Sequence, residues 1–205
     1  MSLYEGYWKK DKAQGRGRMI FANGDYYEGE WAAGKMQGKG TYVAADGAMC
    51  CGEWKGDRLN GEGVENMSDG TEYTGTFVEG AKQGQGLLKW EDGRWYEGEF
   101  TGDEIDGYGV YQWPNGKRYQ GEWKSGVMEG KGEMIFEDGR RYIGEFEDDL
   151  MSGEGVFTWP DGRRYEGTWQ EGLPSGEGHF SHSQGIHQHG AWTNCTFEVD
   201  TVEYL

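Results

Sequence analysis

The chain has 205 residues, of which 20 are Lys or Arg and 37 are Asp or Glu, so its formal net charge is −17. A surface this acidic repels nucleic acid and anionic membranes, and we therefore expect neither as a partner. Hydrophobic residues make up only 35% of the chain, yet aromatic residues make up 15%, a content that disordered chains lack. The composition predicts a folded protein whose core consists of a few large rings packed against glycines.

One column of residues recurs along the chain with an invariant spacing of 23 residues. Cys50 and Gln188 stand at two of its positions, and tyrosines fill the others: Tyr4, Tyr27, Tyr73, Tyr96, Tyr119, Tyr142 and Tyr165. The register continues to Gly190 without insertion or deletion. Such a period is typical of solenoids, propellers and arrays, in which each repeat contacts mainly its neighbours.

Each repeat contains two strand-like segments and two turn signals, which predict a β-hairpin and its connection to the next hairpin. In the repeat that begins at Tyr142, a period of two places aromatic residues and glycines on the same face of both strands. Because glycine weakens a strand, its repeated use predicts the close approach of a ring from the neighbouring repeat. Asp-Gly or Asn-Gly turns close the hairpin connections, from Asn23-Gly24 to Asp161-Gly162.

The residue seven positions after the tyrosine column alternates between Asp and Gly, from Asp11 and Gly34 to Asp149 and Gly172. Both residue types tolerate turn geometry, so the alternation has two interpretations. In the first interpretation, the two are equivalent turn solutions inherited from a duplication of two repeats. Alternatively, odd and even repeats present different loops to a partner with a doubled spacing.

These residues resemble the MORN repeat family, whose pattern of strand, Gly-x-Gly pair and closing turn recurs here as YEGEW…GKG…ADG. The pattern predicts an array of eight MORN repeats in residues 1–187, and a partial ninth repeat with a C-terminal cap in residues 188–205. The resemblance implies an all-β fold: an elongated, single-layer, twisted antiparallel sheet of stacked 23-residue β-hairpins, a MORN solenoid. It also implies a scaffold or adaptor, because members of the family are mostly ciliary, cytoskeletal and junctional components or appendages of enzymes.

The sequence predicts no catalytic residues, no enzymatic activity and no cofactor. The Gly-x-Gly pairs lack the Gly-Lys-Ser/Thr that a phosphate-binding loop requires. Cys50, Cys51 and Cys195 have no disulfide-framework spacing, which is typical of a reducing compartment. For the adjacent pair Cys50 and Cys51, a redox or metal-binding role is the alternative interpretation. Both residues stand in ordinary repeat positions, which does not favour such a role. Together with the lack of an apolar leader or span, these features predict a cytoplasmic protein.

The histidines all lie in the last repeat: His179, His182, His187 and His189. A turn around residues 183–185 would place His182 opposite His187, and His179 near His189, in a geometry that could hold a metal ion. The preferred interpretation is that no metal binds, because terminal repeats differ in order to cap the stack.

Two further columns are candidates for partner binding. The aromatic column is predicted to line a groove: Phe21, Trp90, Trp113, Phe136 and Trp159. The basic column is predicted to form a charged edge: Arg94, Lys117, Arg140 and Arg163. Its preferred interpretation is cross-strand pairing with acidic columns, and the alternative is a binding strip for an acidic partner. The alternative for the aromatic column is that it serves as core alone, packed on the next repeat's glycines. A single-layer sheet cannot bury both faces, and Trp is a typical hot-spot residue, which favours a groove in addition to a core.

The segment GIHQHGAW and the acidic residues after it are similar to the final repeats of radial spoke head MORN proteins of motile cilia. We therefore expect a scaffold in the axoneme of a cilium or flagellum, with partners among the proteins of an axonemal or cytoskeletal assembly. The alternatives are a cortical cytoskeleton scaffold and a phosphoinositide-binding module, which the net charge opposes. A homodimer through a terminal repeat is compatible with the sequence.

Overall fold

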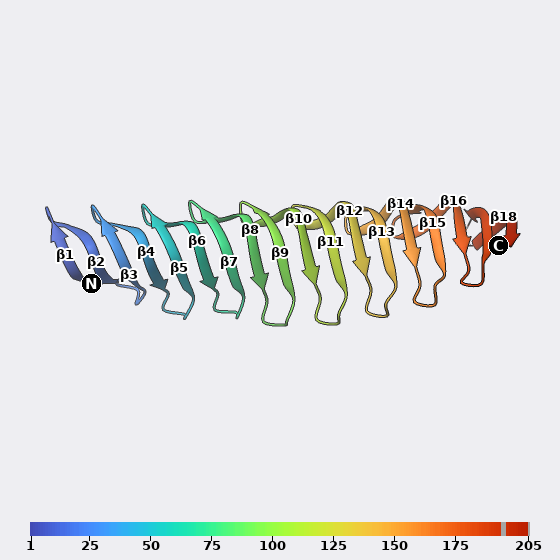
Figure 1. Cartoon of the computed structure of the whole chain (residues 1–205). Coiled ribbons are helices and arrows are strands. Elements are labelled where there is room, and N and C mark those ends of the chain that lie inside the picture. Colours follow the sequence, from blue (N-terminus) through green and yellow to red (C-terminus); the bar gives the residue numbers. More distant parts are fainter. Residues whose placement is uncertain (194–195, 205) are drawn as a thin grey trace. The chain divides into compact units, whose positions relative to one another are not determined.

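A computed structural model describes residues 1–193 and 196–204 as β-strands and turns, in two compact units. Unit 1 is Met1–Glu104 and unit 2 is Ile105–Leu205 (Figure 1). Cys195, the third cysteine of the sequence, lies outside the described residues.

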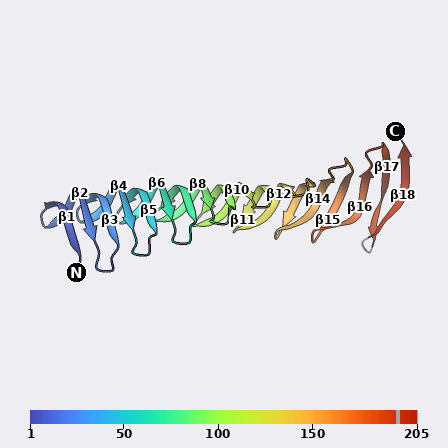
Figure 2. The ribbon, with the colours of Figure 1, turned by 90° about the horizontal axis from the view of Figure 1, so that it is seen from below.

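The strands of unit 1 pair antiparallel in chain order, each with the strand before and the strand after it. They are β1 (Leu3–Lys9), β2 (Lys12–Ile20), β3 (Tyr26–Ala32), β4 (Lys35–Val43), β5 (Met49–Lys55), β6 (Arg58–Asn66), β7 (Glu72–Val78), β8 (Ala81–Lys89) and β9 (Trp95–Thr101). The hairpin turns lie along the two margins of the sheet (Figure 2).

Unit 2 repeats this arrangement. Its strands are β10 (Glu104–Gln112, whose first residue closes unit 1), β11 (Arg118–Lys124), β12 (Val127–Ile135), β13 (Arg141–Glu147), β14 (Leu150–Thr158), β15 (Arg164–Gln170), β16 (Leu173–Ser181), β17 (Ile186–Thr193) and β18 (Thr196–Tyr204). The prediction of an all-β, antiparallel sheet of 23-residue hairpins is confirmed in both units.

The turn within each hairpin has the same backbone geometry whether Asp or Gly occupies the alternating column. Ala33 and Gly34 have φ values of 53° and 86°, and Gly56 and Asp57 have values of 60° and 74°, as a type I′ turn requires. Asp57 differs only in adding a side-chain bond, since its Oδ1 accepts a hydrogen bond from the Met36 N–H at 2.8 Å. The two residue types are therefore equivalent solutions of one turn, and Asp also ties that turn to the preceding repeat.

The Gly-x-Gly pair serves two separate purposes, as the repeat that starts at Tyr27 shows. Gly38 has φ of 62° and lies where the register shifts between Gly29 and Trp31, which is a β-bulge. Gly40 lies beneath the Tyr27 ring, and a Cβ atom there would overlap the tyrosine hydroxyl. The first glycine is thus needed for backbone conformation and the second for space.

The tyrosine ring packs on the glycines of its own repeat, and this corrects the expectation of a ring from the neighbouring repeat. Tyr27 covers both Gly29 and Gly40 of its own hairpin. The ring that does reach the neighbouring repeat is the tryptophan four residues later: Trp31 donates its indole N–H to the Gly17 carbonyl at 3.1 Å. The tyrosine therefore holds a hairpin together, and the tryptophan joins it to the preceding one.

These rings form a continuous core on one side of the sheet within each unit, which we call the aromatic face. Tyr27 is fully buried and makes edge-to-face contacts with Trp31 and Trp54, with ring centroids 5.1 and 5.2 Å apart. The same full burial holds for Tyr73, Tyr96, Tyr119, Tyr142 and Tyr165. The opposite side, which we call the polar face, carries the charged residues that alternate with the rings along each strand.

Candidate functional site

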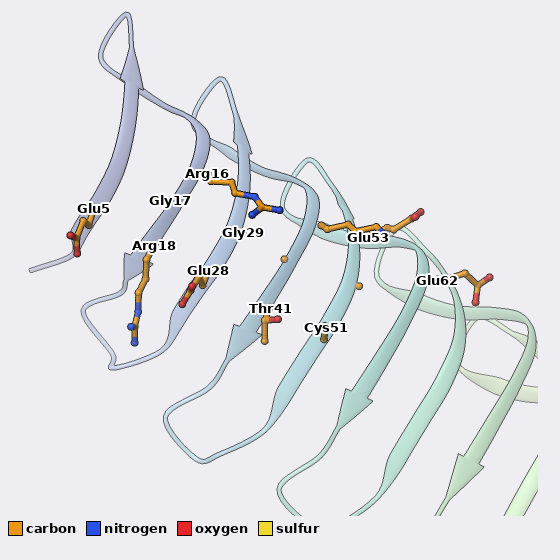
Figure 3. Close-up of a pocket in the computed structure, with 13 residues that line it drawn as sticks. Glu5, Arg16, Gly17, Arg18, Glu28, Gly29, Thr41, Cys51, Glu53 and Glu62 are labelled. Carbon is orange, nitrogen blue, oxygen red and sulfur yellow. The ribbon is translucent and has the colours of Figure 1, made fainter.

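A hollow of about 810 Å³ lies on the polar face of unit 1 (Figure 3). Its floor is the backbone of Gly17, Gly29, Gly40 and Gly52, which succeed one another across β2 to β5. Two rows of side chains flank this floor: Glu5, Arg18, Glu28, Thr41 and Cys51 in one, and Arg16, Lys39, Glu53 and Glu62 in the other. We call this hollow the unit 1 trough.

The hollow forms because, on each strand, the residues before and after the floor glycine point to the polar face and leave the glycine backbone between them. Glu28 and Glu30, for example, flank Gly29 on β3 and stand to either side of the floor. Along one row, directly paired residues run from Glu5 through Arg18 to Glu28. A Cβ atom on Gly40 would point to the Tyr27 ring on the aromatic face, so the floor presents backbone alone to the polar face. Another main chain can approach this floor between the charged walls.

Unit 2 has an equivalent arrangement, the unit 2 trough, made of two overlapping hollows of about 450 and 560 Å³. They share Glu122, Lys131 and Glu145. The first also contains Tyr108, Gln120, Gly132, Glu133, Ile143, Gly144 and Glu154, and the second also contains Glu129, Gly130, Phe146, Glu147 and Ser152. Tyr108 and Ile143 are 49% and 42% exposed, so apolar surface borders this trough.

The two troughs differ in charge. The unit 1 trough has three basic and four glutamate side chains in its lining. The unit 2 trough has Lys131 as its one basic residue and six glutamates: Glu122, Glu129, Glu133, Glu145, Glu147 and Glu154. Glu133 is partly neutralised by an ion pair with Arg141. Unit 2 therefore presents a markedly more acidic trough than unit 1.

The predicted aromatic and basic columns come together at the margin of the Asp-Gly turns. The Lys117 Nζ lies 4.4 Å from the centroid of the Trp113 ring, and burial lowers the pKa of Lys117. The same pairing recurs elsewhere, with guanidinium carbons 4.9, 5.2 and 5.4 Å from the ring centroids: Arg94 over Trp90, Arg140 over Phe136 and Arg163 over Trp159. Phe21 instead contacts Tyr42, with centroids 5.9 Å apart. These rings are half-buried, so they belong to the core and keep an exposed edge.

The arginines of the basic column pair with aspartates of their own turns, which corrects the expectation of cross-strand pairing. Arg163 Nε lies 2.7 Å from Asp161 Oδ2, and a hydrogen bond from the Arg163 backbone N–H is the main cause that lowers the pKa of Asp161. Arg140 pairs with Asp138 at 2.6 Å in the same way. At these turns much of the predicted basic edge is neutralised locally.

The structure brings one predicted histidine pair together and separates the other. His179 is directly opposite His189, with ring centroids 4.5 Å apart, as predicted. His187 faces Ser181, whereas His182 lies on the aromatic face with its Nε2 3.2 Å from the Gln188 Oε1, so the expected pairing of His182 with His187 is wrong. Among residues 1–193 and 196–204, no three His, Cys, Asp or Glu side chains come together in a way that could hold a metal ion.

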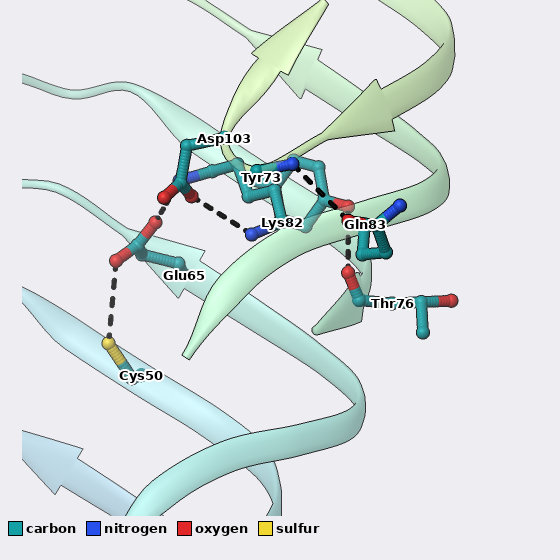
Figure 4. Close-up of polar contacts among 8 residues, drawn as sticks. Cys50, Glu65, Tyr73, Thr76, Lys82, Gln83 and Asp103 are labelled. Carbon is teal, nitrogen blue, oxygen red and sulfur yellow. Dashed lines mark hydrogen bonds and ion pairs between the residues drawn. The ribbon is translucent and has the colours of Figure 1, made fainter. Parts of the chain in front are cut away.

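A polar cluster interrupts the aromatic face of unit 1 and was missed by the sequence analysis (Figure 4). Lys82 Nζ lies 2.6 Å from Glu65 Oε2 and 3.8 Å from Asp103 Oδ1, although the Lys82 side chain is only 11% exposed. The Cys50 thiol lies 3.8 Å from Glu65 Oε1. Burial, followed by the negative charge of Glu65, raises the pKa of Cys50 to about 11.

The signal for this cluster is present in the sequence as three departures from the repeat. Cys50 stands where most repeats have tyrosine. Glu65 and Lys82 stand in columns that otherwise hold uncharged residues: Met19, Tyr42, Leu88, Tyr111, Met134, Phe157 and Phe180 for the first, and Ala13, Met36, Leu59, Ile105, Met128, Met151 and Pro174 for the second. Cys51 lies on the polar face in the unit 1 trough, so the two adjacent thiols are on opposite faces of the sheet.

In the part of the chain that the structure describes, no helix has the length and apolar character needed to cross a membrane.

Comparisons with known proteins place these repeats in a family. No curated protein matches the sequence. Among solved structures, the chain is similar to the TCP domain of SAS-4 from Drosophila melanogaster, solved in complex with a proline-rich motif of Ana2, with 12% identity, a TM-score of 0.49, and coverage of 86% of this chain and 90% of that one. It is also similar to the TCP10 domain of Danio rerio CPAP, solved with a peptide of STIL, with 14% identity, a TM-score of 0.33, and full coverage of both chains. TM-scores this low say nothing about what this chain binds.

The family model described as MORN repeat matches eight successive segments: residues 4–26, 27–49, 50–72, 73–93, 96–118, 119–140, 142–163 and 165–186. These segments follow the hairpins of both units and the 23-residue spacing of the tyrosine column. The chain therefore belongs to the MORN repeat family.

Proposed function

We propose that this chain is a non-enzymatic scaffold that holds extended segments of other proteins on the polar face of its MORN sheet. The observation that carries this proposal is the trough, which recurs in both units with a backbone floor and charged walls. An open backbone floor lets a partner's main chain lie close to the sheet, and charged walls select the partner and its orientation.

The dimensions of the unit 1 trough suit a short extended segment. The row that begins at Glu5 on β1 ends at Cys51 on β5, and strands lie about 4.8 Å apart, so the row covers roughly 19 Å. About six residues of an extended chain have this length, at roughly 3.3 Å per residue.

The turn margin provides a second contact region in this proposal. Trp113 and Trp159 keep an exposed edge beside a cation, and such rings supply much of the binding energy at protein interfaces. Because the arginine charges are balanced by aspartates of the same turns, we expect the rings to contribute more to binding than the charges do.

We further propose that this scaffold acts in the axoneme of motile cilia or flagella, as part of a radial spoke head. The similarity of the GIHQHGAW segment to the final repeats of such proteins supports this setting. The alternatives are the cortical cytoskeleton and a phosphoinositide-containing membrane, and the net charge of −17 opposes the latter.

Affinity capture of the tagged protein from ciliated and non-ciliated cells tests both statements. Identified axonemal proteins should be captured by the wild-type chain and lost with Arg16→Glu/Lys39→Glu in the unit 1 trough, while circular dichroism stays unchanged. The variant Trp113→Ala/Trp159→Ala tests separately whether the turn margin contributes to the capture of these proteins. Retention of the same proteins by both variants would refute binding through these surfaces. Salt-sensitive co-sedimentation with phosphoinositide vesicles would instead favour the membrane alternative.

A further inference from the structure

We propose that the unit 2 trough binds an extended segment rich in lysine or arginine, with a basic residue at every third position. This inference rests on the proposed scaffold function and names the chemistry of one partner segment. It is carried by the charge of the trough, the exposed apolar residues at its border, and the spacing of its glutamates.

Charge complementarity selects a basic occupant. Six glutamates and one lysine line the two overlapping hollows of unit 2. Glu122, Glu145 and Glu154 are exposed, so their carboxylates are available to a partner's cations from solvent. An acidic segment would meet like charges throughout this trough, whereas a basic segment would find an opposite charge in every repeat that it crosses.

Apolar contacts add to this selection. The side chains of Tyr108 and Ile143 border the trough and are 49% and 42% exposed. Long basic side chains have apolar stems that pack on such surfaces while their charged ends stay hydrated near carboxylates. Lysine and arginine therefore fit both features of this trough.

The repeat spacing sets the period of the occupant. Glu122 and Glu145 occupy equivalent positions in successive repeats, on β11 and β13, two strands apart. Two strand spacings amount to about 9.6 Å, and three residues of an extended chain cover roughly 9 to 10 Å. A segment that runs across the strands would thus present every third side chain to the same column of glutamates.

Unit 1 provides a matched comparison within the same chain. Glu30 and Glu53 stand in the column of Glu122 and Glu145, and Glu30 accepts a hydrogen bond from the Lys39 backbone N–H at 3.3 Å, as Glu122 does from the Lys131 N–H. Lys39 opposite Glu53 has its equivalent in unit 2, where Lys131 lies opposite Glu145. The difference lies one repeat earlier, because Glu30 pairs across the strands with Arg16, whereas Glu122 pairs with the uncharged Tyr108. A basic segment should therefore prefer unit 2.

The test uses a labelled synthetic peptide with lysine at every third position and proline and alanine between, titrated into the full chain and followed by fluorescence anisotropy. Glu122→Gln/Glu145→Gln should weaken binding about tenfold, because two charge contacts are lost while the hydrogen-bond acceptor is kept. The matched control Glu30→Gln/Glu53→Gln should change it less than twofold. Binding should also weaken as salt rises.

Two results would overturn this inference. One is an equal effect of the unit 1 and unit 2 substitutions. The other is equal or tighter binding of a control peptide of the same composition with its lysines in one block, which would indicate charge attraction without register. If the peptide fails while captured axonemal proteins still depend on the troughs, the scaffold proposal stands and only this choice of segment is wrong.

A different observation, the polar cluster on the aromatic face, carries a second proposal. We infer that the Glu65–Lys82 ion pair, in which the Lys82 side chain is nearly buried, fixes the order in which the repeats of unit 1 stack. The hairpins are near-copies, so apolar columns of one repeat can pack on those of a wrong neighbour in the same chain or in a second copy. Glu65 belongs to the repeat that starts at Cys50, and Lys82 to the repeat that starts at Tyr73.

The pair is complete only when these two repeats are adjacent. At any other junction Lys82 would meet an uncharged residue such as Tyr42 or Leu88 in place of Glu65. The longer 3.8 Å contact with Asp103 would then have to balance this nearly buried charge, and the loss of its 2.6 Å partner is unfavourable. The small Cys50 side chain directly opposite Glu65 leaves room for the carboxylate where a tyrosine ring stands in other repeats. Buried polar pairs are known to specify register in other repetitive assemblies.

The variant Glu65→Leu/Lys82→Leu replaces both charged residues with leucine, which occurs elsewhere in each of their columns. It removes the difference between this junction of two repeats and the other junctions. After refolding from denaturant, this variant should form dimers and larger species through exchanged hairpins, measured by light scattering after gel filtration. A control at the exposed pair, Arg58→Gln/Glu79→Gln, should refold with the wild-type distribution. A wild-type distribution for the leucine variant as well would overturn this proposal.

Discussion

The ring of Tyr119 lies directly on the backbone of Gly132, and a Cβ atom on Gly132 would lie 2.5 Å from the tyrosine Cε2. The tyrosine is fully buried, and its hydroxyl donates a hydrogen bond to the Glu122 carbonyl at 2.9 Å. The ring is thus held by packing on the Gly132 backbone and by the hydrogen bond at its hydroxyl, and both contacts lie within one hairpin.

Gly132→Ala should therefore lower the free energy of unfolding by about 2 kcal/mol, the usual cost of overpacking a core. Urea denaturation measures this change. The same substitution in a Tyr119→Cys background should cost much less, because Cys occupies the equivalent position 50 and leaves space above the glycine. An equal cost in both backgrounds would show that the ring is not the cause.

Stability should fall steeply in alkaline solution between about pH 10 and 12. Burial, followed by the charge of a nearby glutamate, raises the pKa of Tyr27 and of Tyr73 from 10.0 to about 12. Between these values the folded chain keeps protons that the unfolded chain releases, so the stabilisation is complete below pH 10 and is lost as pH rises to 12. Tyrosinate absorbance and circular dichroism, followed together, should change in one transition. Ionisation near pH 10 with an intact sheet would contradict the packing of these rings.

The two adjacent thiols should differ strongly in reactivity. Burial raises the pKa of Cys50 to about 11, whereas Cys51 is exposed on the polar face. In a Cys195→Ser background, Cys51 should react with an aromatic disulfide reagent near neutral pH, and Cys50 only after unfolding, because the thiolate is the reactive form. The variants Cys50→Ser and Cys51→Ser assign the two rates. Fast reaction of Cys50 in the folded chain would refute its burial against Glu65.

Exchanging the residues of the alternating turn column should have unequal effects. Asp149 Oδ1 accepts a hydrogen bond from the Met128 N–H at 2.8 Å, so Asp149→Gly should cost about 1 kcal/mol of unfolding free energy. Asp149→Ala should cost roughly 1 kcal/mol more, because φ at this residue is 69°.

The reverse change, Gly126→Asp, should be close to neutral, because both residue types adopt the same turn and Gly126 has φ of 84°. Chemical denaturation of the three turn variants provides the comparison. A large loss for Gly126→Asp would show that the two turn solutions are not interchangeable.

The period of the sequence was enough to predict the hairpins, the turns and the order of the strands, because tyrosine, glycine and Asp-Gly positions recur without a shift. It could not show which glycines each ring would cover. Gly29 pairs with Gly40 of its own repeat and with Gly17 of the preceding repeat, and the structure shows that the Tyr27 ring covers Gly29 and Gly40. Nor could it fix the face of His182, since a shift of one residue in pairing moves a side chain to the opposite face.

The troughs were missed for a related reason. They are made by backbone and by residues that vary from repeat to repeat, whereas a search for recurring residues finds those that pack the core. The aromatic and basic columns were found separately, but their stacking arises from the turn: Arg163 bonds through its backbone N–H to Asp161 and lies over Trp159. The cluster around Lys82 could be recognised in the sequence, because its residues differ from the residue types that the other repeats have in the same columns.

The tryptophan contacts give the stack of unit 1 a direction. Trp31 bonds to Gly17 and Trp54 bonds to Gly40, so each indole depends on the repeat that precedes it in the chain. Trp31 is 5% exposed, whereas Trp8 on the first strand is 53% exposed. A ribosome releases the repeats in this same order, and the docking position for each new indole is therefore complete before that indole leaves the exit tunnel. Growth of the sheet during synthesis can then proceed one hairpin at a time, with neither Trp31 nor Trp54 waiting for a hydrogen-bond acceptor that has yet to be made.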